Sequence, residues 1–134
     1  GKSAVHTGAN ALGKHASAQG IQCAAAANLL ANEQVPHAMV TAFEQSSGHL
    51  AQRLITALEA GISAGGEEGP VRSAGVQVAD QAMWPVVDLR VDWDENPISK
   101  LQTIWIEYQP QLDAYVTRAL NPEAAPSYGV PGDL

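Results

Sequence analysis

Three charged residues, Asp88, Arg90 and Asp92, occupy every second position of residues 85–94, and apolar residues fill the positions between them. A period of two is typical of a β-strand with one apolar and one charged face. Residues on one face of a strand lie ~7 Å apart, so Arg90 can reach one or both acids. Two interpretations stay open: a solvated face with ion pairs worth ~0–1 kcal/mol each, or a polar line facing a cleft or an interface.

Short apolar or alternating runs predict the strands that accompany this one. The middle run is rich in alanine, which prefers helices, but Gly20 before it and Asn28 after it favour a strand. The three further strands are expected at residues 3–7, 21–27 and 72–79.

Two amphipathic helices are expected at residues 35–46 and 49–62, because apolar residues recur there at steps of three and four. Asn32 is the expected N-cap of the first helix. The short link between the helices predicts an antiparallel hairpin whose apolar stripes pack on one layer. Leu54 belongs to the second stripe, and Leu54→Ala would cost ~2–5 kcal/mol if this side chain is buried. The stripes comprise Val35, Ala38, Met39, Ala42 and Phe43, and Ala51, Leu54, Ile55, Leu58 and Ile62.

A third helix is expected to begin at Pro97, which suits the first helical turn. Trp105 and Tyr108 lie on its apolar stripe and are expected to anchor the core. Pro110 should kink this helix or split it in two. The order strand, strand, helix hairpin, strand, strand, helix predicts a layered α+β domain over residues 1–120, followed by an extended proline- and glycine-containing tail at 121–134.

Composition limits the partners of this 134-residue chain, whose length suits one domain. The net charge of −7 and the lack of any Lys/Arg run argue against nucleic acid. No run of 18 apolar residues predicts a membrane span, and no signal peptide opens the chain. The single cysteine, Cys23, excludes an intrachain disulfide and suggests a reducing, cytoplasmic setting; we expect it to be a small buried hydrophobe.

Motifs for metal and cofactor binding are absent from the sequence. The histidines do not have metal-ligand spacing, and the chain contains no phosphate-binding loop, dinucleotide fingerprint or nucleophile elbow. We therefore expect no metal and no cofactor. Composition and spacing alone lead no further than an acidic α+β domain.

Several short segments of the sequence resemble a known protein family and say more about the fold than composition does. They lie, in order, at residues 7–15, 27–31, 50–66, 87–92, 97–101 and 125–133. Through them the chain resembles the C-terminal part of a bacterial family of unknown function with an N-terminal-nucleophile (Ntn) hydrolase-like fold. The resemblance implies a four-layer αββα sandwich with antiparallel sheets.

The chain departs from an Ntn hydrolase at its first residue. Such enzymes use the side chain of their own first residue as nucleophile and its free α-amine as base. Gly1 has no side chain to offer. The resemblance therefore implies that a nucleophile would come from an N-terminal segment outside this chain. We expect that segment as a separate chain, or a second copy in its place.

Two functions are consistent with the resemblance, because a fold does not decide between them. The first is an Ntn-type amidohydrolase acting on a small amide-like compound, with Asn28 as oxyanion donor. Thr7, His15, Asp88 and Arg90 would shape its substrate pocket. The structural alternatives are a cap role for Asn28 and a backbone-bonded loop role for His15. The second function is a non-catalytic binding or assembly protein on the same fold.

Overall fold

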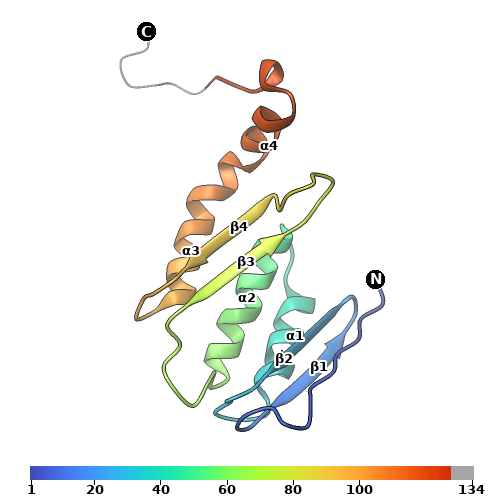
Figure 1. The fold of residues 1–134 in the computed structure, drawn as a ribbon, viewed down its shortest axis with the longest axis vertical. Coiled ribbons are helices and arrows are strands. Elements are labelled where there is room, and N and C mark those ends of the chain that lie inside the picture. The colour runs from blue at the N-terminus through green and yellow to red at the C-terminus, as the bar shows by residue number, and fades with distance from the viewer. Residues whose placement is uncertain (128–134) are drawn as a thin grey trace.

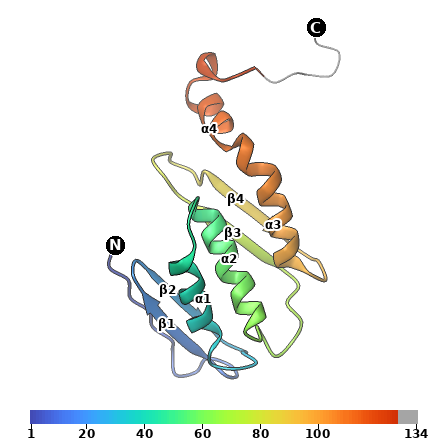
Figure 2. The same ribbon diagram turned by 180° about the vertical axis from the view of Figure 1, so that it is seen from behind.

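The computed structural model describes residues 1–127, which form a layer of strands and a layer of helices (Figure 1). Both sheets are antiparallel hairpins, β1 with β2 and β3 with β4. Viewed from behind, α1, α2 and α3 cover one face of the hairpins (Figure 2). The predicted α+β class is confirmed. The elements are β1 (Ala16–Gly20), β2 (Cys23–Ala27), α1 (Val35–Gln45), α2 (Leu50–Ser63), β3 (Ala74–Val78), β4 (Val87–Val91), α3 (Pro97–Tyr108), η1 (Gln109–Gln111), α4 (Leu112–Leu120) and η2 (Pro122–Ala124).

The order of elements agrees with the sequence, but the position of the first strand was wrong. The strand expected at residues 3–7 is absent, and β1 forms at Ala16–Gly20 instead. The N-terminal segment lies along β1 through side chains: Gln19 Nε2 donates to the Ser3 carbonyl at 2.8 Å, and Ser3 Oγ donates to the Gly20 carbonyl at 3.1 Å. The backbone of β1 pairs with β2 across an alanine-rich register, and this non-local pairing selects the strand.

The helical hairpin is confirmed within one or two residues of its expected ends. Asn32 is not the N-cap of α1, which is Gln34. Asn32 instead joins the two ends of the hairpin, because its Oδ1 accepts from the Gln34 N–H at 2.9 Å and its Nδ2 donates to the Ala64 carbonyl at 2.7 Å. His49 caps α2, since its Nδ1 accepts from the Ala51 N–H at 3.1 Å.

The main core lies where α2 and α3 pack on β3 and β4. Trp105 is fully buried, as the sequence predicted, and its ring centroid lies 4.9 Å from that of His49. Pro110 splits the third helix as expected: α3 ends at Tyr108, a short 3₁₀ turn follows, and α4 begins at Leu112.

The tail expected over residues 121–134 begins with a 3₁₀ turn at Pro122–Ala124 rather than an extended strand. Arg118 Nη2 donates to the Pro126 carbonyl at 2.7 Å and holds the start of the tail against α4. The remainder of the expected tail, residues 128–134, lies outside the described residues.

The charged alternation that defines β4 lies on the face away from the helices. Val87 and Val91 are buried, whereas Asp88 and Arg90 are exposed. Within residues 1–127 no ion pair joins Arg90 to Asp88 or Asp92, so the predicted pairing was wrong. An ion pair at an exposed strand face gains only ~0–1 kcal/mol, which is too little to fix long side chains.

The Tyr108 hydroxyl links the end of α3 to the segment before β4, donating to the Val86 carbonyl at 2.9 Å. Burial, and secondarily the neighbouring Tyr115, raises the pKa of Tyr108 above its ordinary value. We expect Tyr108→Phe to lower the free energy of unfolding by ~0.5–1.5 kcal/mol at neutral pH. The folded state holds the neutral phenol more strongly than the unfolded state does. This contribution is complete below the unfolded pKa of ~10 and is lost as pH rises through the raised folded value.

Urea unfolding of wild type and Tyr108→Phe across this alkaline range checks the expectation. The difference between the two proteins should shrink as pH rises, whereas Tyr115→Phe, at a half-exposed ring, should change little. A difference that stays constant with pH would contradict the assignment.

Candidate functional site

A cavity of about 360 Å³ lies where the N-terminal segment passes the end of β2. Two of the residues expected at a site, Thr7 and Asn28, line this cavity together. Thr7 belongs to the segment beside β1, and Asn28 directly follows β2. The complete lining is His6, Thr7, Gly8, Ala11, Ala26, Ala27 and Asn28.

The side chain of Asn28 is held by the loop that precedes β1. The Leu12 carbonyl accepts from Asn28 Nδ2 at 3.3 Å and also from the Leu29 N–H at 3.1 Å. The Leu30 N–H donates to the Lys14 carbonyl at 3.0 Å, and this second hydrogen bond holds the same loop against the segment that follows β2. An amide nitrogen carries two hydrogens, so Asn28 keeps one N–H for another acceptor.

Leu29, next to Asn28, has a left-handed backbone with φ of 54°. A bulky residue rarely adopts this conformation, and such strain persists only where the surroundings impose it. Here the Leu29 N–H is bonded to Leu12, and the Leu29 carbonyl accepts from the Glu68 N–H at 2.8 Å. Contacts on both sides therefore force the chain to turn directly after Asn28. Strained positions of this kind cluster at functional sites.

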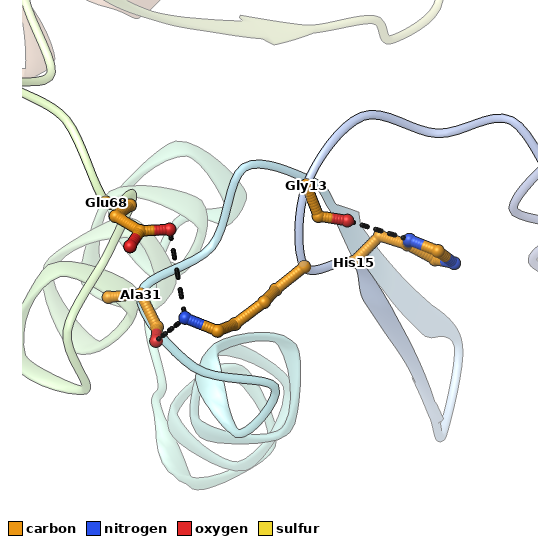
Figure 3. A network of polar contacts seen from close by, with 5 residues as sticks. Gly13, His15, Ala31 and Glu68 are labelled. Atoms are coloured by element: carbon orange, nitrogen blue, oxygen red, sulfur yellow. Dashed lines mark hydrogen bonds and ion pairs between the residues drawn. The ribbon is translucent and has the colours of Figure 1, made fainter.

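A polar network fixes the neighbouring loop without joining the cavity (Figure 3). Lys14 Nζ donates to the Ala31 carbonyl at 3.3 Å and lies 3.8 Å from Glu68 Oε2. His15 Nδ1 lies 3.2 Å from the Gly13 carbonyl, and its ring is exposed and directed away from Glu68. His15 thus occupies the position of a backbone-bonded loop histidine.

The hydroxyl of Thr7 is buried and has no hydrogen-bond partner within residues 1–127. Leaving a buried hydroxyl unpaired costs ~1–3 kcal/mol, and such groups are rare in folded proteins. Thr7 lines the cavity, but its hydroxyl oxygen is shielded, so a bound molecule reaches this oxygen only after a local rearrangement.

The other expected site residues lie elsewhere. Asp88 and Arg90 are on β4, in the other hairpin, and do not line the cavity. Sequence reasoning missed His6 and Ala11 as lining residues. No local pattern marks them, because the path of the N-terminal segment over the end of β2 depends on non-local contacts.

The described part of the chain holds no group of three His, Cys, Asp or Glu residues that could bind a metal ion. The polar side chains that line the cavity are the Asn28 amide, the Thr7 hydroxyl and the His6 imidazole, and none of them is a carboxylate or a permanent charge. Of the helices within residues 1–127, none has the length and apolar character to span a membrane.

Residues 1–101 match the model of DUF1028, a family of unknown function. The chain belongs to the DUF1028 family. The crystal structure of protein SPO2555 from Silicibacter pomeroyi, also assigned to DUF1028, is similar with a TM-score of 0.63 and 30% sequence identity. The match covers 71% of this chain and 40% of that chain. No curated protein matches the sequence.

The DUF1028 assignment agrees with the unknown function that the resemblance implied. It supports the family, and it names neither a reaction nor an Ntn-hydrolase-like fold. This DUF1028 chain spans less than half of SPO2555, so a large part of the neighbour has no counterpart in these 134 residues.

Proposed function

We propose that this DUF1028 chain forms one wall of an Ntn-type amidohydrolase site that acts on a small amide-like compound. The observation that carries the proposal is one cavity lined by both Thr7 and Asn28, in which the Asn28 amide keeps one N–H for a ligand. The match covers only 40% of SPO2555, which supports a nucleophile on a part of the family protein outside these residues.

Amide hydrolysis needs hydrogen-bond donors where charge develops. Attack on the carbonyl carbon places a negative charge on its oxygen, and preorganised N–H groups stabilise that charge. The Leu12 carbonyl orients the Asn28 amide through one hydrogen, and the other hydrogen donates to the oxyanion. The nucleophile gives its proton to its base, the base passes this proton to the leaving amine as the C–N bond breaks, and water then hydrolyses the acyl-nucleophile bond to release the carboxylic acid. The depression of about 360 Å³ is shallow and open to solvent, so in this proposal the part of the enzyme that brings the nucleophile also closes the site.

One observation favours the second function, binding without catalysis. The described residues supply no activated nucleophile at the cavity, since Thr7 Oγ1 has no hydrogen-bonded base within residues 1–127, whereas binding needs only groups that are already there. In that case the cavity binds the amide through Thr7 and Asn28 and leaves it intact.

Binding is tested by titrating the isotope-labelled chain with acetamide and N-acetylglycine while recording NMR spectra. We expect the signals of Thr7 and the Asn28 side chain to shift. Asn28→Ala should weaken binding by ~10-fold, the value of one hydrogen bond of ~1.4 kcal/mol. Asn10→Ala is the matched control, because Asn10 is an exposed residue of the same loop that does not line the cavity.

Hydrolysis is tested on a full-length family protein that contains this chain together with the part that brings the nucleophile. The protein is incubated with the same two amides, and the amine released is measured. If the site is catalytic, Asn28→Ala should lower kcat by ~10²–10³-fold. Binding with intact amide would instead establish the second function. If neither amide shifts the Thr7 or Asn28 signals, both proposals for this cavity are wrong.

A further inference from the structure

An apolar trough runs between the two hairpins and meets the Asn28 cavity at the end of β2, where Ala26 and Ala27 line both. It consists of two adjoining cavities of about 330 and 280 Å³. The cavities share lining residues from both hairpins and from the helices α1 and α2, so they form one continuous depression. The shared residues are Ala26, Met39, Leu58 and Gly75.

The sides of the trough are the edges of two strands that face each other (Figure 1). Residues 23–26 of β2 form one side and residues 75–77 of β3 form the other. Within the described chain, β2 pairs only with β1 and β3 only with β4. Each inner edge therefore presents unpaired backbone N–H and C=O groups, which favour pairing with another strand.

The floor of the trough is the part of the predicted helix stripes that the strands do not cover. Met39, Leu54 and Leu58 are only half-buried, although they lie on the same side as the sheet layer. Figure 2 shows α1 in front of the β1–β2 hairpin and α2 in front of β3, so the packed pair of helices bridges the gap between the sheets. The helix layer is thus wider than the strand layer that should cover it.

We propose that the trough is the seat of a β-strand from the part of the DUF1028 domain outside these 134 residues. This strand pairs with β2 on one side and β3 on the other, and it merges the two hairpins into one sheet. Adjacent strands lie ~4.8 Å apart, so two facing edges select an extended backbone over a helix or a small ligand. The occupant presents apolar side chains toward Met39 and Leu58 at every second position.

The source of the strand follows from the family comparison. SPO2555 is similar in fold, and the match covers only 40% of its chain, so that protein has further polypeptide from which such a strand can come. A second copy of the present chain would bring another pair of incomplete sheets. The inference rests on the strand edges and the floor, and it does not depend on the proposed hydrolase.

Cys23 provides a direct reporter, because it is the only cysteine of the sequence and lines the trough from β2. The thiol is half-buried rather than buried as the sequence suggested, since no strand covers it from the β3 side. Its rate of reaction with a disulfide reagent, 5,5′-dithiobis(2-nitrobenzoate), therefore measures whether the trough is occupied.

The experiment co-expresses the 134-residue chain with the part of SPO2555 that lies outside the match. We expect a one-to-one complex in which Cys23 labelling and the amide hydrogen exchange of β2 and β3 slow by ~10-fold or more. Leu58→Lys, which charges the floor, should weaken the complex. Ile106→Lys, at a 57% exposed position of α3 outside the trough, should leave it unchanged. Circular dichroism of each variant alone verifies that it folds.

The two parts of SPO2555 expressed as separate polypeptides form the positive control. If those two parts associate with each other but the present chain does not bind the part of SPO2555 outside the match, the proposal is wrong. A complex that leaves Cys23 labelling unchanged also overturns it. A homodimer of the present chain that protects Cys23 would show that a second copy fills the trough. None of these readouts involves hydrolysis, so the proposed function stands or fails separately.

Discussion

Trp105→Ala should lower the free energy of unfolding by ~3–5 kcal/mol, enough to unfold a large fraction of a domain of this size. Trp105 is 0% exposed and belongs to the core in which α2 and α3 pack on β3 and β4. Its ring also packs on His49, the residue that caps α2. Alanine would leave a large cavity and remove the contact that holds this cap. Urea unfolding followed by far-ultraviolet circular dichroism measures the loss without relying on the tryptophan itself.

Two further tryptophan variants distinguish the effect of burial on stability from the effect of the indole ring itself. The buried indole Nε1 of Trp105 has no hydrogen-bond partner within residues 1–127, so Trp105→Phe removes an unpaired N–H together with some volume. It should cost less than the alanine change. Trp93→Ala, at a 74% exposed ring beside Arg72, should cost no more than ~1 kcal/mol. Equal losses at Trp93 and Trp105 would contradict the placement of the core.

The helices could be predicted from sequence because their signals are local. Apolar steps of three and four identified α1, α2 and α3, and Pro110 marked the break before α4. The strand β1 could not be predicted in the same way. Its sequence, Ala-Ser-Ala-Gln-Gly, has no β-branched residue, and it becomes a strand because β2 pairs with it. The run at residues 3–7 has better strand residues but no backbone partner.

The candidate site was predictable only through resemblance. Thr7 and Asn28 are 21 positions apart, and no periodicity relates them; the loop that bonds through Leu12 brings them to one cavity. The alternation of Asp88 and Arg90 correctly indicated a two-faced strand. It could not decide between solvent and a cleft for the charged face, which the structure leaves exposed, because that depends on elements packed from other parts of the fold.

Ile55→Ala should lower the free energy of unfolding by ~2–5 kcal/mol, whereas its neighbour Leu54→Ala should cost only ~1–2 kcal/mol. The sequence placed both residues on one buried stripe of α2. In the structure Ile55 is 0% exposed among core residues, and Leu54 is half-buried at the floor of the trough. The two positions share one helix, so a difference between their losses reports burial. Urea unfolding of both variants measures it, and equal losses would show that Leu54 is already covered.

The same pair of variants responds to occupation of the trough. A strand seated between β2 and β3 would cover Leu54 and leave the surroundings of Ile55 unchanged. In the complex with the remaining part of the domain, Leu54→Ala should therefore approach the ~2–5 kcal/mol of a buried leucine. Ile55→Ala should destabilise the chain equally with and without the partner. A Leu54→Ala cost that does not change on complex formation would place the partner elsewhere on the molecule.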